Sequence, residues 1–64
     1  MPMKLSEKKP DGRRLCNVVL GYRTDRFSIK DARLRIRVST GELAWHYVGG
    51  SYLANDKDRW AYAT

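Results

Sequence analysis

The stretch from Arg33 to Val38 constrains the fold more than any other part of the chain, because cationic and aliphatic residues alternate there without a break. Successive side chains of a β-strand point to opposite faces, so this pattern would put every arginine on one face and every aliphatic residue on the other. Helical spacing would scatter the arginines around a cylinder. We therefore predict a strand with one face on a core and one cationic face.

A returning strand follows this segment. Residues 39–42 form a turn in which Gly41 can adopt a positive φ, and residues 43–48 follow as the second strand. An even number of loop residues pairs Ile36 with Trp45 and makes one continuous apolar face, whereas an odd number mixes the faces. The predicted pairs of this central hairpin, at about 33–48, are Val38 with Leu43, Ile36 with Trp45, Leu34 with Tyr47, Arg33 with Val48, Arg35 with His46, and Arg37 with Ala44.

Weaker patterns flank the hairpin. Residues 14–22 alternate on two fairly apolar faces, which predicts a central strand. The apolar residues Phe27 and Ile29 are out of phase with Leu34, so the chain must shift phase between residues 30 and 33. A β-bulge and a short helical turn both account for this shift. The other predicted elements are a polar connection at 23–26, a turn at 55–58 and a short last strand at 59–63, for which a single terminal helical turn is the alternative.

The first twelve residues have a different composition from the rest. Residues 1–12 are rich in lysine and poor in apolar side chains, which predicts a flexible, basic tail. The turn signal at 10–12 separates this tail from residues 13–64, which we expect to form a single β domain because the chain is too short for two. The predicted fold is all-β, with a small antiparallel sheet of three to four strands. Either a well-packed monomer or a homodimer would supply its stability.

The charge of the chain indicates an anionic partner. Thirteen Lys and Arg residues against seven Asp and Glu residues give a formal net charge of +6 over 64 residues. Such an excess attracts polyanions. The sequence has no apolar run long enough to span a bilayer, so no membrane contact is expected. A single cysteine is typical of a reducing compartment, and we expect the protein in the cytoplasm.

The predicted cationic face is the main candidate for function. Arg33, Arg35 and Arg37 would stand roughly 6.5–7 Å apart, a spacing that resembles successive phosphates of a nucleic-acid strand. The facing residues of the paired strand include no acid. A solvated sheet surface is the alternative interpretation, although such a surface usually mixes both signs of charge. We expect a nucleic-acid-binding module for DNA or RNA.

An acidic protein surface is the other expected partner, because arginine and aromatic residues also dominate protein interfaces. The protein would then be a small inhibitor or adaptor, of the phage type, that docks on a larger host protein. Trp60 and Tyr62 could stack on bases, contact a protein partner or seal the edge of the core. The candidate binding residues are Arg33, Arg35, Arg37, His46, Arg13, Arg14, Trp60 and Tyr62.

Enzymatic activity is not expected. His46 is the only histidine and has no acid placed to orient it, as a catalytic dyad requires. Cys16 alternates with core positions and is expected to be a small buried residue. Asp56 and Asp58 lie in the predicted turn and are expected to serve it. One cysteine and one histidine cannot complete a zinc site, so we expect no catalytic residues, metal or cofactor.

Overall fold

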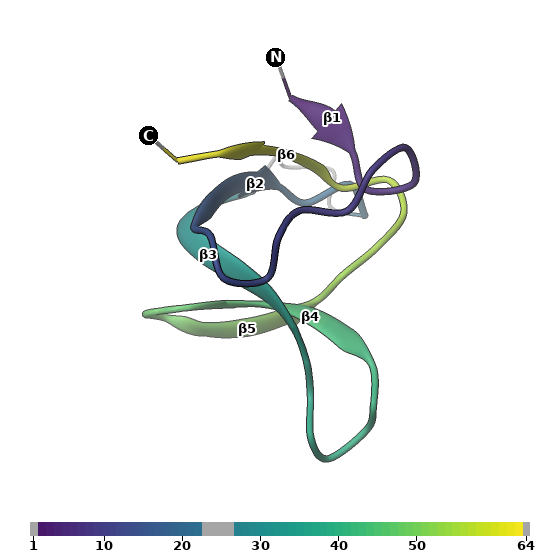
Figure 1. Cartoon of the computed structure of the whole chain (residues 1–64), viewed down its shortest axis with the longest axis vertical. Helices are drawn as coiled ribbons and strands as arrows, with labels where there is room; N and C mark the ends of the chain where they lie inside the picture. Colours follow the sequence, from purple (N-terminus) through teal and green to yellow (C-terminus); the bar gives the residue numbers. More distant parts are fainter. Residues whose placement is uncertain (1, 23–26, 64) are drawn as a thin grey trace.

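The computed structural model describes residues 2–22 and 27–63, and every regular element in this part of the chain is a β-strand. The strands form one antiparallel sheet in the order β1-β6-β2-β3-β4-β5 (Figure 1). No described segment is a helix long and apolar enough to cross a membrane. The six strands are β1 (Met3–Lys4), β2 (Cys16–Val19), β3 (Ser28–Ile36), β4 (Leu43–Tyr47), β5 (Gly50–Leu53) and β6 (Arg59–Tyr62).

The all-β prediction is confirmed, but the sheet has six strands where the sequence pattern predicts three to four. The two additional strands lie at the edges of the sheet. β1 has only two residues, too few for a recognisable alternation. β5 begins at Gly50, which pairs with Tyr47 across a two-residue turn and takes a positive φ of 132°. The predicted connection at 23–26 lies outside the described residues.

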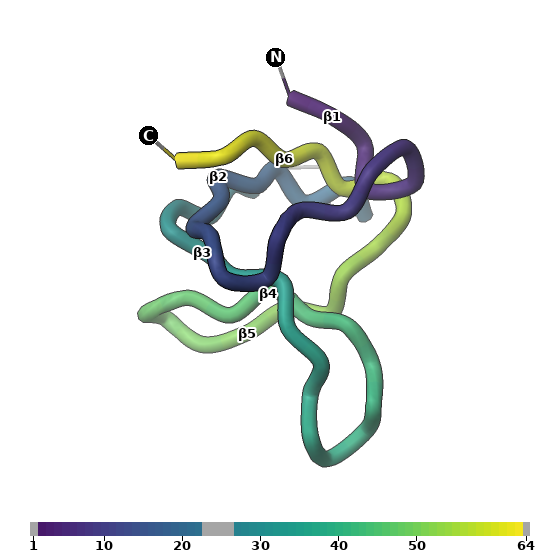
Figure 2. Tube along the Cα trace, viewed as in Figure 1, coloured from purple at the N-terminus to yellow at the C-terminus, as the bar shows by residue number. Residues whose placement is uncertain are grey.

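Strand β3 joins the two halves of the sheet. Its first part pairs with β2 and its last part pairs with β4. Figure 1 shows β6 and β2 in one layer and β4 and β5 in another, with β3 running between them. The chain between β1 and β2 crosses the open side between the two layers (Figure 2). We call the sheet face that points into the space between the two layers the inner face, and the opposite face the outer face.

A β-bulge in β3 resolves the phase shift that the sequence left open. Cys16 pairs with Ala32 but Val18 pairs with Ile29, so β3 contains one extra residue at this point. Asp31 takes a φ of 56°, which aspartate tolerates better than most residues. Its backbone N–H donates to Asn17 Oδ1 at 3.4 Å. The bulge lets the buried residues change from odd to even numbers while the strand continues.

The central hairpin has the predicted faces but a different register. Leu34 lies opposite Trp45 and Ile36 lies opposite Leu43, so each pair is shifted by two residues from the prediction. A two-residue shift leaves every side chain on its original face. The cause is the position of the turn: Arg37 N donates to Glu42 O at 2.8 Å, which makes residues 38–41 the loop. Gly41 supplies the positive φ of 75°.

The core lies between the two layers and includes Cys16 of β2, as the sequence predicts. Trp45 is completely buried, as is Cys16. Burial raises the pKa of the Cys16 thiol, and the smaller opposing effect of the Arg14 charge does not reverse this shift. The thiol therefore stays neutral near pH 7 and packs as a small apolar residue. The core cluster comprises Leu5, Cys16, Val18, Leu20, Ile29, Ala32, Leu34, Trp45 and Trp60.

The carboxylate of Asp58 connects three distant parts of the chain and is completely buried. Its Oδ2 accepts hydrogen bonds from Trp45 Nε1 at 2.8 Å and from Asn55 N at 2.9 Å. Its Oδ1 accepts one from Gly21 N at 2.7 Å. Gly21 packs so closely on Lys57 that an added Cβ would lie 2.2 Å from the Lys57 carbonyl oxygen. The predicted turn role of Asp58 thus extends to the core.

The segment predicted to be a tail contributes to the sheet and to the core. β1 pairs with β6, and Leu5 is buried. The backbone N–H of Leu5 donates to Asp58 O at 2.8 Å. Further along, Lys8 O accepts a hydrogen bond from Trp60 Nε1 at 2.8 Å. The N-terminal segment therefore packs against β6, and it contacts Trp60 through the pairing of Met3 and through Lys8 O.

Candidate anion-binding face

Three cations project from the outer face of β3. Lys30, Arg33 and Arg35 are all exposed, and each directly follows a residue that is buried on the inner face, namely Ile29, Ala32 and Leu34. The bulge at Asp31 keeps Lys30 on the same face as the two arginines. Arg33 and Arg35 are two residues apart on a strand, which places them roughly 6.5–7 Å apart. We call Lys30, Arg33 and Arg35 the cationic row.

A shallow cleft adjoins the arginines of the cationic row. Its volume is about 320 Å³, and Arg33, Arg35, Ile36 and His46 line it. The strand pairing explains this arrangement, because Arg33 lies opposite His46 and Arg35 lies opposite Ala44. Ala44 itself is completely buried, so the two arginines, Ile36 and His46 form the walls of the cleft. The predicted gathering of Arg33, Arg35 and His46 on one face is therefore present.

No acid neutralises the cationic row within the part of the chain that the structure describes. The ion pair among the described residues lies outside the row and joins Arg13 to Asp11, with Arg13 Nε 3.8 Å from Asp11 Oδ1. Asp31 is the acid nearest in sequence, and it is exposed at the bulge. Unpaired cations on one surface produce a positive potential that attracts anions. The row therefore has the electrostatic character of an anion-binding surface.

His46 brings an unsatisfied polar atom to the cleft. Its Nε2 is buried and has no hydrogen-bond partner among the described atoms. In the sheet, His46 lies between Arg33 of β3 and Ser51 of β5. A buried nitrogen without a partner is unfavourable, so a group that supplied one would stabilise this position. Over the described ranges, no three His, Cys, Asp or Glu side chains are grouped as metal ligands.

Arg37 does not belong to the row, which corrects the sequence-based prediction. It follows the last residue of β3, and its guanidinium Nη2 donates to Ser51 Oγ at 3.0 Å. Because β4 lies between β3 and β5, this side chain must cross β4 to reach its partner. Arg37 is half-buried and tied to β5. Lys30 is the third cation of the row instead of Arg37. The sequence indicated this position only through the phase shift between residues 30 and 33.

Arg13 and Arg14 are engaged with their own neighbourhood. Arg13 is highly exposed and near Asp11, as described above. The guanidinium of Arg14 lies 3.6 Å from the centre of the Tyr62 ring, a cation–π contact. Neither residue lines the cleft beside the row. These contacts hold the chain that leads into β2, and they leave Arg13 as the more accessible cation of the two.

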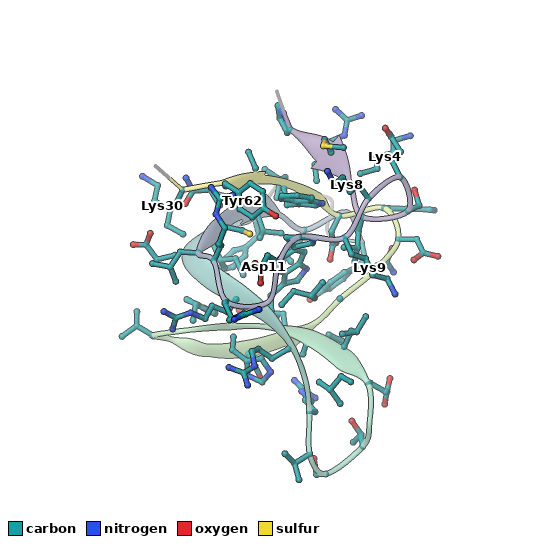
Figure 3. All side chains as sticks on the ribbon, in the orientation of Figure 1. Lys4, Lys8, Lys9, Asp11, Lys30 and Tyr62 are labelled. Carbon is teal, nitrogen blue, oxygen red and sulfur yellow. The ribbon has the colours of Figure 1, made fainter. Side chains whose placement is uncertain are left out.

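The two C-terminal aromatic residues serve the fold. Trp60 is buried, which favours the core-sealing interpretation over base stacking or a partner contact. Tyr62 is half-buried, and its hydroxyl accepts a hydrogen bond from Asp11 N at 2.9 Å. The two rings also pack edge to face, with centroids 4.9 Å apart. Figure 3 shows Tyr62 and Asp11 on the open side of the molecule, with Lys30 at its edge.

The fold and the face together define a small all-β protein whose outer sheet surface carries cations that no acid of the described residues neutralises. The chain matches no family model, no curated protein and no solved structure.

Proposed function

We propose that this protein binds nucleic acid through the phosphate backbone, with the cationic row as its main contact. The observation that carries the proposal is that Lys30, Arg33 and Arg35 are exposed on one face without an acid paired to them in the described structure. Arginine offers a planar fork that suits phosphate oxygens. Nucleic acid is the most abundant polyanion in a cytoplasmic setting, so DNA and RNA are the natural candidates.

Recognition would depend on phosphates more than on bases. Binding to single strands commonly uses aromatic side chains on which bases stack. The cleft beside the row is lined by Ile36 and His46 together with the arginines, and Trp60 and Tyr62 are engaged elsewhere. Contacts to phosphate carry no sequence information. The expected binding is therefore electrostatic and nearly independent of sequence.

The salt dependence of affinity tests this mechanism. Three neutralised phosphates predict a slope of about −2.7 for duplex DNA in a plot of log affinity against log salt, or roughly a 40-fold loss between 50 and 200 mM, and a slope of about −2.1, or roughly an 18-fold loss, for a single strand. The measurement is fluorescence anisotropy with a labelled 20-residue oligonucleotide, repeated with DNA and RNA. An affinity that stays flat across this range would exclude the phosphate mechanism.

Charge reversal in the row supplies the residue-level test. The double variant Arg33→Glu/Arg35→Glu should lose at least roughly tenfold in affinity at 100 mM salt, because two phosphate contacts become repulsive. The variant Lys9→Glu/Lys57→Glu is a matched control, since it changes the net charge equally at two exposed lysines. Figure 3 shows Lys9 and Lys30 on opposite sides of the molecule. Equal losses in both variants would indicate that net charge alone drives binding.

A variant that gains affinity complements this pair. Asp31→Asn removes the acid between Lys30 and Arg33 and preserves a residue that tolerates a positive φ. Affinity should rise roughly twofold, the scale of one screened charge a few ångströms from the ligand. Circular dichroism of each variant shows whether its fold is retained.

A further inference from the structure

A second hollow lies on the outer face of β6, β2 and the first half of β3. Its volume is about 220 Å³, and its lining includes Val19, Ser28, Lys30, Arg59 and Pro2. We call it the Arg59 groove. Lys30 lines the groove, whereas Arg33 and Arg35 line the cleft further along β3. The proposed nucleic-acid site and this groove therefore meet only at Lys30.

The strand register explains why the surface is hollow here. Val19 lies between Arg59 of β6 and Ser28 of β3 in one cross-strand row. In the next row Ala61 lies opposite Asn17. Short side chains thus form the floor between the longer Arg59 and Lys30. Pro2, which precedes β1, also lines the groove.

The floor of the groove is apolar and accessible. Val19 remains 40% exposed although it lies in the middle of the sheet. Its neighbours on the inner face of β2, Cys16 and Val18, are fully buried. A central strand that shows an aliphatic side chain to solvent gains free energy when another apolar group covers it. Val19 can therefore contribute to binding through burial.

The rim of the groove is cationic. Arg59 and Lys30 line it, and Lys4 lies beside Arg59 in the pairing of β1 with β6. None of the described lining residues is an acid. Lys4 and Arg59 lie opposite each other on neighbouring strands and repel each other. An anionic group bound beside them would relieve this unfavourable interaction. The groove therefore combines an apolar floor with positive edges.

We propose that the Arg59 groove docks an extended segment of a partner protein in which an aliphatic residue adjoins an acidic one. Protein interfaces place apolar contacts at the centre and polar contacts at the rim, with arginine enriched. A second copy of this chain is disfavoured, because it would bring Arg59 and Lys30 against cations. The aliphatic floor offers no aromatic ring for base stacking. The small area indicates a weak, transient complex.

A random twelve-residue peptide library, displayed on phage and selected on the immobilised protein, tests this proposal. Enriched peptides should carry Asp or Glu next to Val, Leu or Ile. Synthetic copies of these peptides should lose at least tenfold in affinity for Arg59→Glu and several-fold for Val19→Gln, as measured by fluorescence anisotropy. Both substitutions are at exposed positions, and circular dichroism checks that each variant folds.

The matched control is the Arg33→Glu/Arg35→Glu variant, which should bind the selected peptides within threefold of the unmodified protein. Conversely, Arg59→Glu should bind the oligonucleotide within threefold. Failure of oligonucleotide binding alone would overturn the proposed function and leave the groove proposal standing.

Four results would overturn the groove proposal. One is that no peptide is enriched above the Arg59→Glu background, and another is that enriched peptides lack acids. A third is that Arg59→Glu weakens the oligonucleotide as strongly as the Arg33→Glu/Arg35→Glu variant does, which would assign the groove to nucleic acid. The fourth is a dimer in sedimentation velocity that Val19→Gln dissociates, which would assign it to a second copy.

Discussion

Asp58 shows how one side chain can organise a small sheet. Its two carboxylate oxygens accept three hydrogen bonds, from Trp45, Asn55 and Gly21. Tryptophan N–H groups usually require a partner when they are buried. The acid therefore allows the large Trp45 indole to occupy the core without an unsatisfied donor. It also holds the turn before β6 against the end of β2.

Replacing Asp58 with alanine should strongly destabilise the fold. The substitution leaves the buried Trp45 N–H without its acceptor, which costs about 1–3 kcal/mol, and it also removes the acceptor of the partly buried Asn55 and Gly21 N–H groups, each at a smaller cost. We expect a loss of roughly 3 kcal/mol in the free energy of unfolding, measured by urea denaturation with tryptophan fluorescence. Asp56→Ala is the matched control, because Asp56 is exposed two residues away. A similar midpoint for both variants would contradict the role assigned to Asp58.

The sequence predicted residue roles where they follow from local alternation, and it missed those that depend on distant partners. Arg33 and Arg35 are exposed on the predicted face because strand alternation alone determines this. Arg37 has the same parity, but its position depends on Ser51, which the pattern cannot place. The burial of Trp60 depends on the N-terminal segment in the same way. Local patterns therefore determine on which face of the sheet a side chain lies, whereas tertiary contacts determine whether that side chain is accessible to a ligand.

At the scale of elements, the hairpin shows that the alternation of side chains does not determine the strand register. Parity excludes an odd loop, and the structure agrees with it. A slide of two residues preserves every face, so parity cannot distinguish the predicted pairs from the observed ones. The observed register leaves Ile36 and Val38 exposed, because β4 begins only at Leu43. The turn hydrogen bond from Arg37 to Glu42 selects this register, and its energy is not visible in an apolar pattern.

The N-terminal segment provides a prediction at the same scale. Leu5 is buried in the core cluster, so Leu5→Ala should lower the free energy of unfolding by about 2 kcal/mol, near the low end for such truncations. Urea denaturation measures this loss. Ser6→Ala is the control, since Ser6 is exposed at the next position. A flexible tail, as composition alone suggests, would give the two variants the same midpoint.

At the scale of the whole molecule, β3 connects two surfaces of different character. Beyond the bulge its outer face carries Arg33 and Arg35 beside the cleft, and before the bulge it carries Ser28 in the Arg59 groove. The layers that support these surfaces lie on opposite sides of the core (Figure 1). If both proposals hold, one bent strand presents separate surfaces to a nucleic acid and to a protein partner, and a protein of this size would bridge the two ligands without a second domain.

The net charge of the molecule gives salt two opposite effects. Repulsion among the cations of a chain with a formal charge of +6 destabilises the compact state, and added salt screens this repulsion. The melting temperature should rise on the order of 5 °C between 10 and 200 mM NaCl, as followed by circular dichroism. Over the same range the affinity for an oligonucleotide should fall.

The Arg33→Glu/Arg35→Glu variant separates the two effects. Each substitution lowers the formal charge by two, so the double variant carries +2, and its melting temperature should vary less with salt. If the melting temperature of the unmodified protein instead falls with added salt, attractive ion pairs dominate its stability. If this fall is absent in the double variant, Arg33 and Arg35 supply those ion pairs, and the reason to expect an anionic ligand would disappear.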